Sequence, residues 1–407
     1  MLRRGLGEGR SSSIRVPGFR AAGIRCGIKK EGLDLALVVS DAPAAVAGVF
    51  TRSSVVGAPV ELSRARVRRG RSRGVVVNSG VSNVAMGKRG LRDAAEMARL
   101  AAVAVGCAPE EMLVASTGVI GRPLPMARLR EGVRLASDAL APGGFARAAR
   151  AIMTTDTFAK TARATARVGG RIVTIGGIAK GSGMIEPDMA TMLGFLCTDA
   201  AVSPAFLRAA LRRATDASFN RVSVDGETST SDAVILLANG CAGNAPLRGP
   251  RSPGAARFEA ALGEVTRSLA RDLARDGEGA TRLVTVRVAG AASPAEAERA
   301  ARRIANSLLV KTAVFGADPN WGRILQTVGA GRVRVRLPRT RVDLAGVTVF
   351  HRGAPRGPAA VARAAARLRA SREVEIRVEL GAGRSAAWVW TCDLSYDYVR
   401  INAEYTT

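Results

Sequence analysis

Histidine is almost missing from this sequence: the 407 residues include a single one, His351. Imidazole is the side chain that most often serves as a general base, so a Ser-His-Asp or Cys-His triad has only this candidate. His351 follows Phe350 at the end of an apolar, strand-like stretch. A structural or surface position is the simpler interpretation for such a residue.

Cysteines are few as well, and none is spaced as Cys-x-x-Cys. The five cysteines are odd in number and far apart: Cys26, Cys107, Cys197, Cys241 and Cys392. Zinc sites and disulfide frameworks need close or paired cysteines, and a zinc site would have one histidine to draw on. We therefore expect no metal site and no disulfide framework.

Long apolar runs are also lacking. The chain has no run of about 18 apolar residues, so it predicts no membrane-spanning helix and no membrane partner. Residues 1–20 are rich in Arg, Ser and Gly and lack the apolar core of a secretory signal. A short transit-like leader stays open as an alternative, and the simpler expectation is a cytoplasmic protein.

Acidic residues are outnumbered by basic ones, 34 against 61, which gives a formal net charge of +27. Such a charge can indicate nucleic-acid binding. However, 55 of the basic residues are arginines scattered through nearly every segment, and only 4% of residues are aromatic. Few rings are therefore available to stack on bases. We expect no nucleic-acid partner, although the positive field can attract small anionic substrates.

Turning to what is present, apolar residues make up 47% of the chain, and its length suggests two domains. Alternating patterns predict strands at residues 35–40, 74–78, 171–175, 233–238, 285–288, 333–337 and 374–380. Helical periodicity covers residues 91–105, 126–140, 204–218, 256–275, 294–307 and 358–370. The alternation predicts an α/β or layered α+β protein, with domains at 1–282 and 283–407.

Two of these helices have recognisable start signals. Ser203 precedes Pro204, and Ser293 is followed three residues later by Glu296, a pairing typical of a capping box. Both signals support the predicted starts near residues 204 and 294.

Residues 180–196 form the most informative segment. Lys180 precedes the glycines instead of following them, so the segment is not a phosphate-binding P-loop. One interpretation is a loop followed by a core element that begins at Thr191. The other is that Thr191 is a nucleophile, released if the Ala190–Thr191 bond is cut. Its α-amine would then titrate near pH 8 and could act as the base, which needs no histidine.

Residues 180–198 closely resemble the self-cleaving segment of the ornithine acetyltransferases, the glutamate N-acetyltransferase family of arginine biosynthesis. Further matching segments follow in the same order, at residues 18–24, 47–51, 77–80, 116–121, 153–157, 225–230, 276–281, 310–323 and 401–407. The resemblance implies a layered α+β sandwich like that of N-terminal-nucleophile-type self-cleaving enzymes, with a smaller α/β C-terminal domain.

The resemblance also implies roles for single residues. It makes Thr191 the nucleophile and Ala190–Thr191 the cleaved bond, giving an α chain of residues 1–190 and a β chain of 191–407. Thr117 and Gly118 would form the oxyanion hole. The substrate-binding residues would be Thr157, Lys180, Thr191, Glu278, Asn402 and Thr407. By themselves, residues 116–118 also fit an ordinary turn, and Glu278 fits a solvated residue in a glycine-flanked loop.

The implied reaction moves an acetyl group from N2-acetyl-L-ornithine to L-glutamate through an acetyl-threonine intermediate. It needs no metal and no bound cofactor; some relatives also take acetyl-CoA as a co-substrate, and the sequence does not decide this. A heterotetramer of two α and two β chains is the implied assembly. A self-cleaving amidase or aminopeptidase of related fold is the alternative.

The sequence departs from the family pattern at residues 81–85, at Glu227 and at Ser231. These departures lie outside the nucleophile and oxyanion motifs, so they bear on substrate details more than on the reaction.

Overall fold

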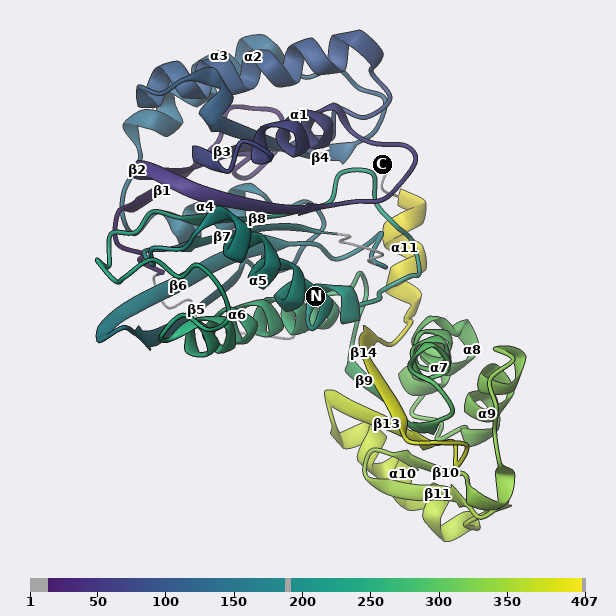
Figure 1. Ribbon diagram of the computed structural model, residues 1–407. Helices are drawn as coiled ribbons and strands as arrows, with labels where there is room; N and C mark the ends of the chain where they lie inside the picture. The colour runs from purple at the N-terminus through teal and green to yellow at the C-terminus, as the bar shows by residue number, and fades with distance from the viewer. Residues whose placement is uncertain (1–13, 187–191, 405–407) are drawn as a thin grey trace. The chain divides into compact units, whose positions relative to one another are not determined.

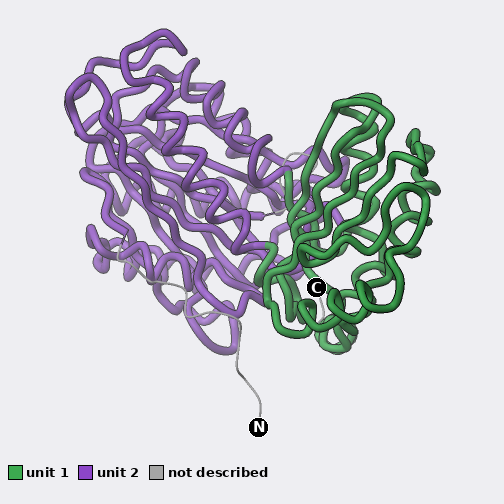
Figure 2. Tube along the Cα trace, turned by 90° about the horizontal axis from the view of Figure 1, so that it is seen from below, with its two compact units in different colours: residues 1–6, 221–226, 274–406 green, residues 7–220, 227–273, 407 purple. Residues whose placement is uncertain are grey.

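The computed structural model describes residues 14–186 and 192–404 (Figure 1). The described residues divide into two compact units (Figure 2). The large unit comprises residues up to 220 together with 227–273, and the small unit comprises 221–226 together with the chain from 274 onward. Among the described residues the chain passes between the units at 220–221, 226–227 and finally 273–274, whereas the sequence predicts one boundary at 282–283.

In the large unit, eight of the described strands form one sheet, in the order β4-β3-β2-β8-β7-β6-β5 with β1 paired to β2. The strands are β1 Phe19–Ile24, β2 Leu35–Phe50, β3 Arg71–Val81, β4 Met112–Val119, β5 Lys160–Val168, β6 Arg171–Lys180, β7 Leu193–Thr198 and β8 Ala233–Ala238. The helices are α1 Ala58–Val67, α2 Gly87–Val105, α3 Met126–Asp138, α4 Phe145–Ala151, α5 Pro204–Asp216 and α6 Ala255–Arg275.

Strand β2 belongs to two layers. Its first half pairs with β1 and β3, its register slips between Val39 and Ala44, and its second half pairs with β8. The sheet therefore folds over on itself, and the two halves enclose one apolar cluster that contains Val38 and Val46 from β2 and Phe195 from β7. Figure 1 shows the two strand layers between α1–α3 on one side and α5 and α6 on the other.

The apolar sequence of β2 explains its burial on both faces. Ala36 and Val38 contribute to the cluster between the layers, whereas Leu35, Leu37 and Val39 contribute to the cluster under α2 and α3. Successive side chains of a strand point to opposite faces, so a strand buried on both faces requires a continuous apolar run.

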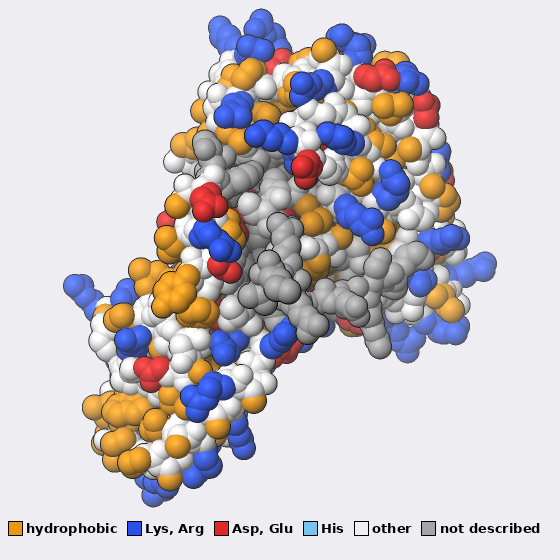
Figure 3. Space-filling view, turned by 180° about the vertical axis from the view of Figure 1, so that it is seen from behind, with side chains coloured by type: hydrophobic (Ala, Val, Ile, Leu, Met, Phe, Trp, Pro, Cys, Tyr) orange, Lys and Arg blue, Asp and Glu red, His pale blue; other side chains and the backbone are white. Residues whose placement is uncertain are grey.

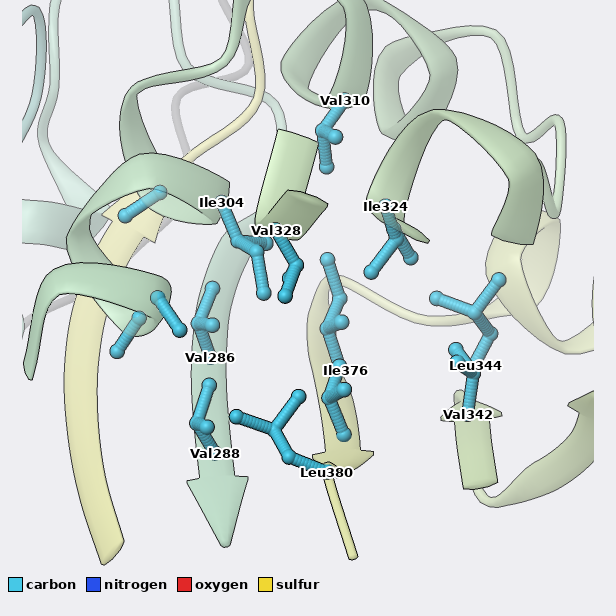
Figure 4. Close-up of a cluster of buried hydrophobic side chains, with 14 of the residues drawn as sticks. Val286, Val288, Ile304, Val310, Ile324, Val328, Val342, Leu344, Ile376 and Leu380 are labelled. Atoms are coloured by element: carbon cyan, nitrogen blue, oxygen red, sulfur yellow. The ribbon is translucent and has the colours of Figure 1, made fainter. Parts of the chain in front are cut away.

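The small unit contains a six-stranded sheet among the described residues, in the order β12-β11-β10-β13-β9-β14. Its strands are β9 Leu283–Ala291, β10 Arg341–Leu344, β11 Val347–His351, β12 Ala354–Pro355, β13 Glu373–Glu379 and β14 Ser385–Cys392. Its helices are α7 Pro294–Asn306, α8 Leu308–Phe315, α9 Trp321–Ala330, α10 Pro358–Ala370 and α11 Tyr396–Glu404. Figure 4 shows the core of this unit, where Val286 and Ile376 of the sheet face Ile304 of α7.

The predicted layered α/β architecture is confirmed, and the six predicted helices correspond to α2, α3, α5, α6, α7 and α10. The strand predicted at residues 333–337 is wrong. Val333 is buried in the core of the small unit and Val335 packs against it, but the segment belongs to no strand and leads into a 3-10 turn at Leu337–Arg339. Its alternating pattern reflects packing without a pairing partner.

Both predicted helix starts are observed, although one differs in detail. The hydroxyl of Ser203 accepts a hydrogen bond from the Phe206 amide, and that of Ser293 accepts one from the Glu296 amide. The Glu296 carboxylate binds the backbone amide and guanidinium of Arg334. None of the described helices has an apolar stretch long enough to cross a bilayer, and all five cysteines are free thiols.

Candidate active site

One row of paired residues crosses four neighbouring strands of the sheet in the large unit. The residues paired across β2, β8, β7 and β6 are Phe50, Ala233, Leu193 and Lys180, which we call the Lys180 row. Leu193 stands two positions after Thr191 in the sequence, so β7 begins just after the predicted nucleophile. Thr191, Ala190 and Thr407 lie outside the described residues.

The predicted oxyanion residues lie at the end of β4, where the sheet is irregular. Gly118 has φ 125° and its pairing partner on β3, Gly80, has φ 105°. A Cβ atom on Gly118 would lie 2.4 Å from the backbone carbonyl carbon of Gly80. Both the left-handed φ and this close approach require glycine at residue 118. Residues 116–118 therefore do not form an ordinary turn: they belong to β4, and the strand has a specific backbone shape at Gly118.

Lys180 contacts Thr117 directly, which brings together two of the predicted site residues. The Lys180 ammonium donates hydrogen bonds to Thr117 Oγ1 at 3.3 Å and to Thr154 Oγ1 at 3.0 Å. Thr117 comes from β4 in one strand layer, and Lys180 from β6 in the other. The two layers of the sandwich thus contribute side chains to one polar cluster.

Asp156 fixes the surroundings of Lys180. Its carboxylate forms an ion pair of 2.7 Å with Lys160, and both side chains are fully buried. It also accepts hydrogen bonds from the Gly181 amide at 2.7 Å and the Thr154 amide at 3.0 Å. Burial alone would raise the pKa of Asp156, but Lys160 and Lys180 outweigh it and hold this pKa well below its usual range.

Lys29 adds a further cation to these surroundings. Its ammonium donates a hydrogen bond of 2.9 Å to the Met153 carbonyl. Burial lowers the pKa of Lys29, and the charge of Lys180 lowers it further, while Asp34 and Asp156 act in the opposite direction. The cluster of Lys29, Lys180 and the threonine hydroxyls is suited to a carboxylate.

Residues 227–233 bind both described residues that flank the segment 187–191. The Glu227 carbonyl accepts a hydrogen bond of 2.8 Å from the Glu186 amide, and the Thr228 hydroxyl donates to the Glu186 carbonyl at 3.0 Å. On the other side, the Ala233 amide donates to the Met192 carbonyl at 3.1 Å. The two described residues that border the predicted cleavage segment, Glu186 and Met192, are therefore bound by the loop before β8 and by the first residue of β8.

This loop ends in a buried acid, Asp232. The residue is 3% exposed, and its Oδ2 has no hydrogen-bond partner within the described ranges 14–186 and 192–404. Burial raises the pKa of Asp232 well above its usual value, and the opposing effects of Ser229 and Lys180 are smaller. A carboxyl group in this setting favours the neutral form, which carries a proton beside the Lys180 row.

The small unit holds the remaining two predicted residues that are described. Asn402 of α11 donates a hydrogen bond of 2.8 Å from Nδ2 to Glu278 Oε2. Gly279 has φ 69°, and a Cβ there would lie 2.4 Å from the Tyr398 amide nitrogen. The glycine beside Glu278 thus permits close packing of its loop on α11, which brings Glu278 and Asn402 together.

Thr157 has a less distinctive place than the other predicted residues. It is exposed and precedes β5. Sequence reasoning missed Thr154, Asp156, Lys29 and Asp232 as members of the cluster. Thr154 and Asp156 do lie in a segment that resembles the family, at 153–157, and this was the available signal. For Lys29 and Asp232 no local motif marked the position.

The two buried acids should give opposite pH dependences of stability. Asp232 has a raised folded-state pKa, so its contribution is present below about pH 4, the usual unfolded value, and is lost as pH rises toward the folded pKa. Asp156 has a depressed pKa, so its contribution is present above about pH 4 and is lost as pH falls.

Urea unfolding of the parent, Asp232→Asn and Asp156→Asn between pH 3 and 8 tests this. Relative to Asp232→Asn, the parent should become less stable as pH rises; relative to Asp156→Asn, it should become more stable. Replacing Asp156 also leaves Lys160 buried without its partner, a loss of about 3–5 kcal/mol at neutral pH. Parallel pH curves for the parent and Asp232→Asn would contradict the assignment of a raised pKa to Asp232.

Comparison with known proteins identifies the family that the chain resembles over most of its length. The model of the ArgJ family matches residues 20–407. The arginine biosynthesis bifunctional protein ArgJ of Symbiobacterium thermophilum is 53% identical over 397 residues, covering 96% of this chain and 97% of that protein. The protein of the same name from Geobacter sulfurreducens is 50% identical over 395 residues, covering 97% and 100%.

Among solved structures, the ArgJ protein of Bacillus halodurans has 42% sequence identity and a TM-score of 0.49, covering 51% of this chain and 96% of that one. The family match from residue 20 to residue 407 and the near-complete coverage of these relatives lead to one conclusion: the chain belongs to the ArgJ family.

Proposed function

We propose that this acyltransferase moves the acetyl group of N2-acetyl-L-ornithine to L-glutamate, with Thr191 as its nucleophile. The family membership supports the reaction, because relatives about half identical over nearly the whole chain are named for arginine biosynthesis. The observation that carries the proposal is the contact between Lys180 and Thr117, beside the strand that begins two residues after Thr191.

The reaction proceeds in two half-reactions. The Thr191 hydroxyl attacks the acetamide carbonyl, and the α-amine of Thr191 takes the hydroxyl proton and returns it to the leaving amine of ornithine. The acetyl group remains on Thr191 as an ester. The amine of glutamate then attacks this ester and loses a proton to the same base. The bond between the acetyl carbon and the Thr191 oxygen breaks, the base returns the proton to that oxygen, and N-acetylglutamate leaves. This scheme requires neither a metal nor a bound cofactor.

Thr117 is suited to donate to the oxyanion. A hydroxyl has one hydrogen to donate and two lone pairs to accept with. Because the Lys180 ammonium can only donate, it occupies a lone pair of Thr117 Oγ1 and leaves the hydroxyl hydrogen available. Gly118, whose backbone shape is fixed by Gly80, would supply the second donor from its amide.

Substrate recognition divides by charge. Lys180 and Lys29 form a cationic cluster for the α-carboxylate that ornithine and glutamate share. Glu278, held by Asn402, suits the distal ammonium of ornithine, which glutamate lacks. The roles of Thr157, Asn402 and Thr407 in substrate binding are proposed from the family resemblance.

The chain reaches this state by cutting itself between Ala190 and Thr191. The Thr191 hydroxyl attacks the carbonyl of Ala190, the acyl group shifts from nitrogen to oxygen, and water hydrolyses the ester. The products are an α chain of residues 1–190 and a β chain of residues 191–407. Two copies of each would form a cytoplasmic heterotetramer. Acetyl-CoA as a second acetyl donor is the additional activity that the bifunctional relatives suggest.

A self-cleaving amidase would pass the acetyl group to water instead of glutamate. The ArgJ match from residue 20 to the terminus favours the transferase. Nucleic-acid binding also finds little support, because Lys and Arg side chains on the face in Figure 3 are spread among apolar, acidic and uncharged ones. Release of free acetate without transfer to glutamate would identify the amidase.

Thr191→Ala should abolish both self-cleavage and acetyl transfer, since it removes the attacking hydroxyl. Denaturing mass spectrometry of the purified parent should give two chains that end and begin at residues 190 and 191, whereas the variant should give one chain of 407 residues. Thr165→Ala, an exposed threonine on β5, serves as the control and should cleave normally. Cleavage of Thr191→Ala, or full activity of uncut parent, would overturn the mechanism.

Thr117→Ala should lower kcat about 100- to 1,000-fold and change KM little, because an oxyanion donor acts on charge that develops in the transition state. Steady-state kinetics on cleaved enzyme would measure this, with cleavage checked by mass so that loss of processing is not mistaken for loss of turnover. A change confined to KM would place Thr117 in ground-state binding.

Glu278→Gln should weaken use of the donor more than use of the acceptor. The substitution keeps shape and removes charge, and a charge-assisted hydrogen bond is worth about 1.5–3 kcal/mol, or about 10- to 150-fold. The ratio of kcat/KM for N-acetylornithine to that for glutamate should fall accordingly in a ping-pong assay. Glu264→Gln on α6 is the exposed control, and equal losses for both substrates would disprove recognition of the ammonium.

A further inference from the structure

A polar cavity lies in the large unit, at the end of the Lys180 row that Phe50 occupies. It has a volume of about 440 Å³, within the range of small-molecule sites. Residues 48–53, at the end of β2 and just beyond it, form one wall, and Arg64 of α1 with Arg208 and Arg212 of α5 form the rest. We call it the arginine pocket.

Cationic side chains dominate this pocket. Four arginines line it, and its described lining includes no Asp or Glu. Arg208 and Arg212 are exposed and stand one helical turn apart on α5, where like charges repel. Within the described part of the chain neither forms an ion pair, whereas the adjacent Arg213 points to Glu259 and binds it.

Arg64 is held in place on the wall of the pocket. Its guanidinium donates a hydrogen bond of 2.6 Å to the Thr51 carbonyl and lies 5.8 Å from the centre of the Phe50 ring. Thr51 is itself anchored, because its hydroxyl donates to the Ser229 carbonyl at 2.8 Å and its amide to the Asp232 carbonyl at 3.1 Å. One guanidinium is therefore positioned in advance, and a ligand would order Arg208 and Arg212.

We propose that the arginine pocket binds the phosphate groups of a nucleotide-sized ligand. Guanidinium groups present planar pairs of N–H donors that match phosphate oxygens, and several of them together favour a ligand with more than one negative charge. A single carboxylate, such as that of ornithine, would leave most of this charge unmatched. The phosphorylated ligand is either a free nucleotide or the nucleotide part of coenzyme A.

The position of the pocket bears on this choice. Phe50 and Lys180 are three strands apart in the same row, which at about 4.8 Å per strand places their backbones roughly 14 Å apart. A free nucleotide would stay at the pocket. Coenzyme A has an extended arm, which would carry its thioester along the row toward Lys180; this second reading rests on the proposed acetyl transfer.

Isothermal titration calorimetry of the purified full-length protein with ADP, coenzyme A and inorganic phosphate, each at low and at physiological salt, tests the proposal. ADP or coenzyme A should bind saturably and more tightly than inorganic phosphate. Arg208→Gln and Arg212→Gln should each weaken this binding about 5-fold, and the double variant about 20-fold, because each removes one exposed ionic contact. Arg213→Gln, on the same helix but outside the pocket, is the matched control.

The binding readout needs no turnover, so its failure is separable from failure of acetyl transfer. If neither ADP nor coenzyme A binds saturably, or if inorganic phosphate binds as tightly as both, the proposal is wrong. Equal weakening by Arg213→Gln would also overturn it, because it would reflect net charge. Coenzyme A binding more tightly than ADP identifies the acyl carrier, and the double variant should then lose transfer from acetyl-CoA while keeping transfer from N-acetylornithine.

Discussion

The candidate active site of the large unit depends on one carboxylate, that of Asp156, which is fully buried away from solvent. Asp156 is buried with Lys160 and also holds the amides of Thr154 and Gly181. These three contacts fix the start of β5, the end of β6 and the loop that presents Thr154. Lys180 takes its position from these contacts, because it directly precedes Gly181 in the sequence and its ammonium donates to the Thr154 hydroxyl. A buried pair of this kind tolerates little change, because either partner left alone is a charge in a medium that cannot solvate it.

The second constraint is the length and bend of β2. A strand of 16 residues that changes partners midway places its two halves in different layers. The Thr117 hydroxyl and the Lys180 ammonium can therefore meet although they belong to strands at different positions in the sheet order. An open, flat sheet with the same strand order would hold β4 and β6 apart by four intervening strands. The polar cluster is thus a consequence of the fold-over.

Local patterns in the sequence predicted much of the fold. Local sequence alone identifies the long amphipathic stretches that form α6 and α7 and the wholly apolar stretch that forms β8. The strand at residues 333–337 did not form, because alternation records which side chains are buried and not whether a neighbouring strand offers hydrogen bonds. Strands β4 and β5 have mixed composition, and each depends on a partner strand: β4 pairs with β3, which is distant in the sequence, and β5 forms a hairpin with β6.

The candidate site, like the fold, contains residues that the sequence predicts and residues that it does not. Lys180, Thr117 and Gly118 were predicted because they lie in segments whose order resembles a family. Lys29 and Asp232 carry no local mark: they are 203 positions apart in the sequence and acquire chemical meaning only from their burial near Lys180. Electrostatic environment is a property of the folded chain, and no window of sequence contains it.

The sheet order has a consequence for how the two halves of the sequence depend on each other. Strands β7 and β8 follow residue 191, yet they lie between β2 and β6, which precede it. Six residue pairs join β8 to β2, and six join β7 to β6. A break in the backbone before β7 would therefore leave two polypeptides woven through one sheet, neither of which has a complete core. Such chains must fold together, so they must be made as one polypeptide and cut afterwards. If they were expressed separately, each fragment would expose the sheet edges that pair with the other fragment.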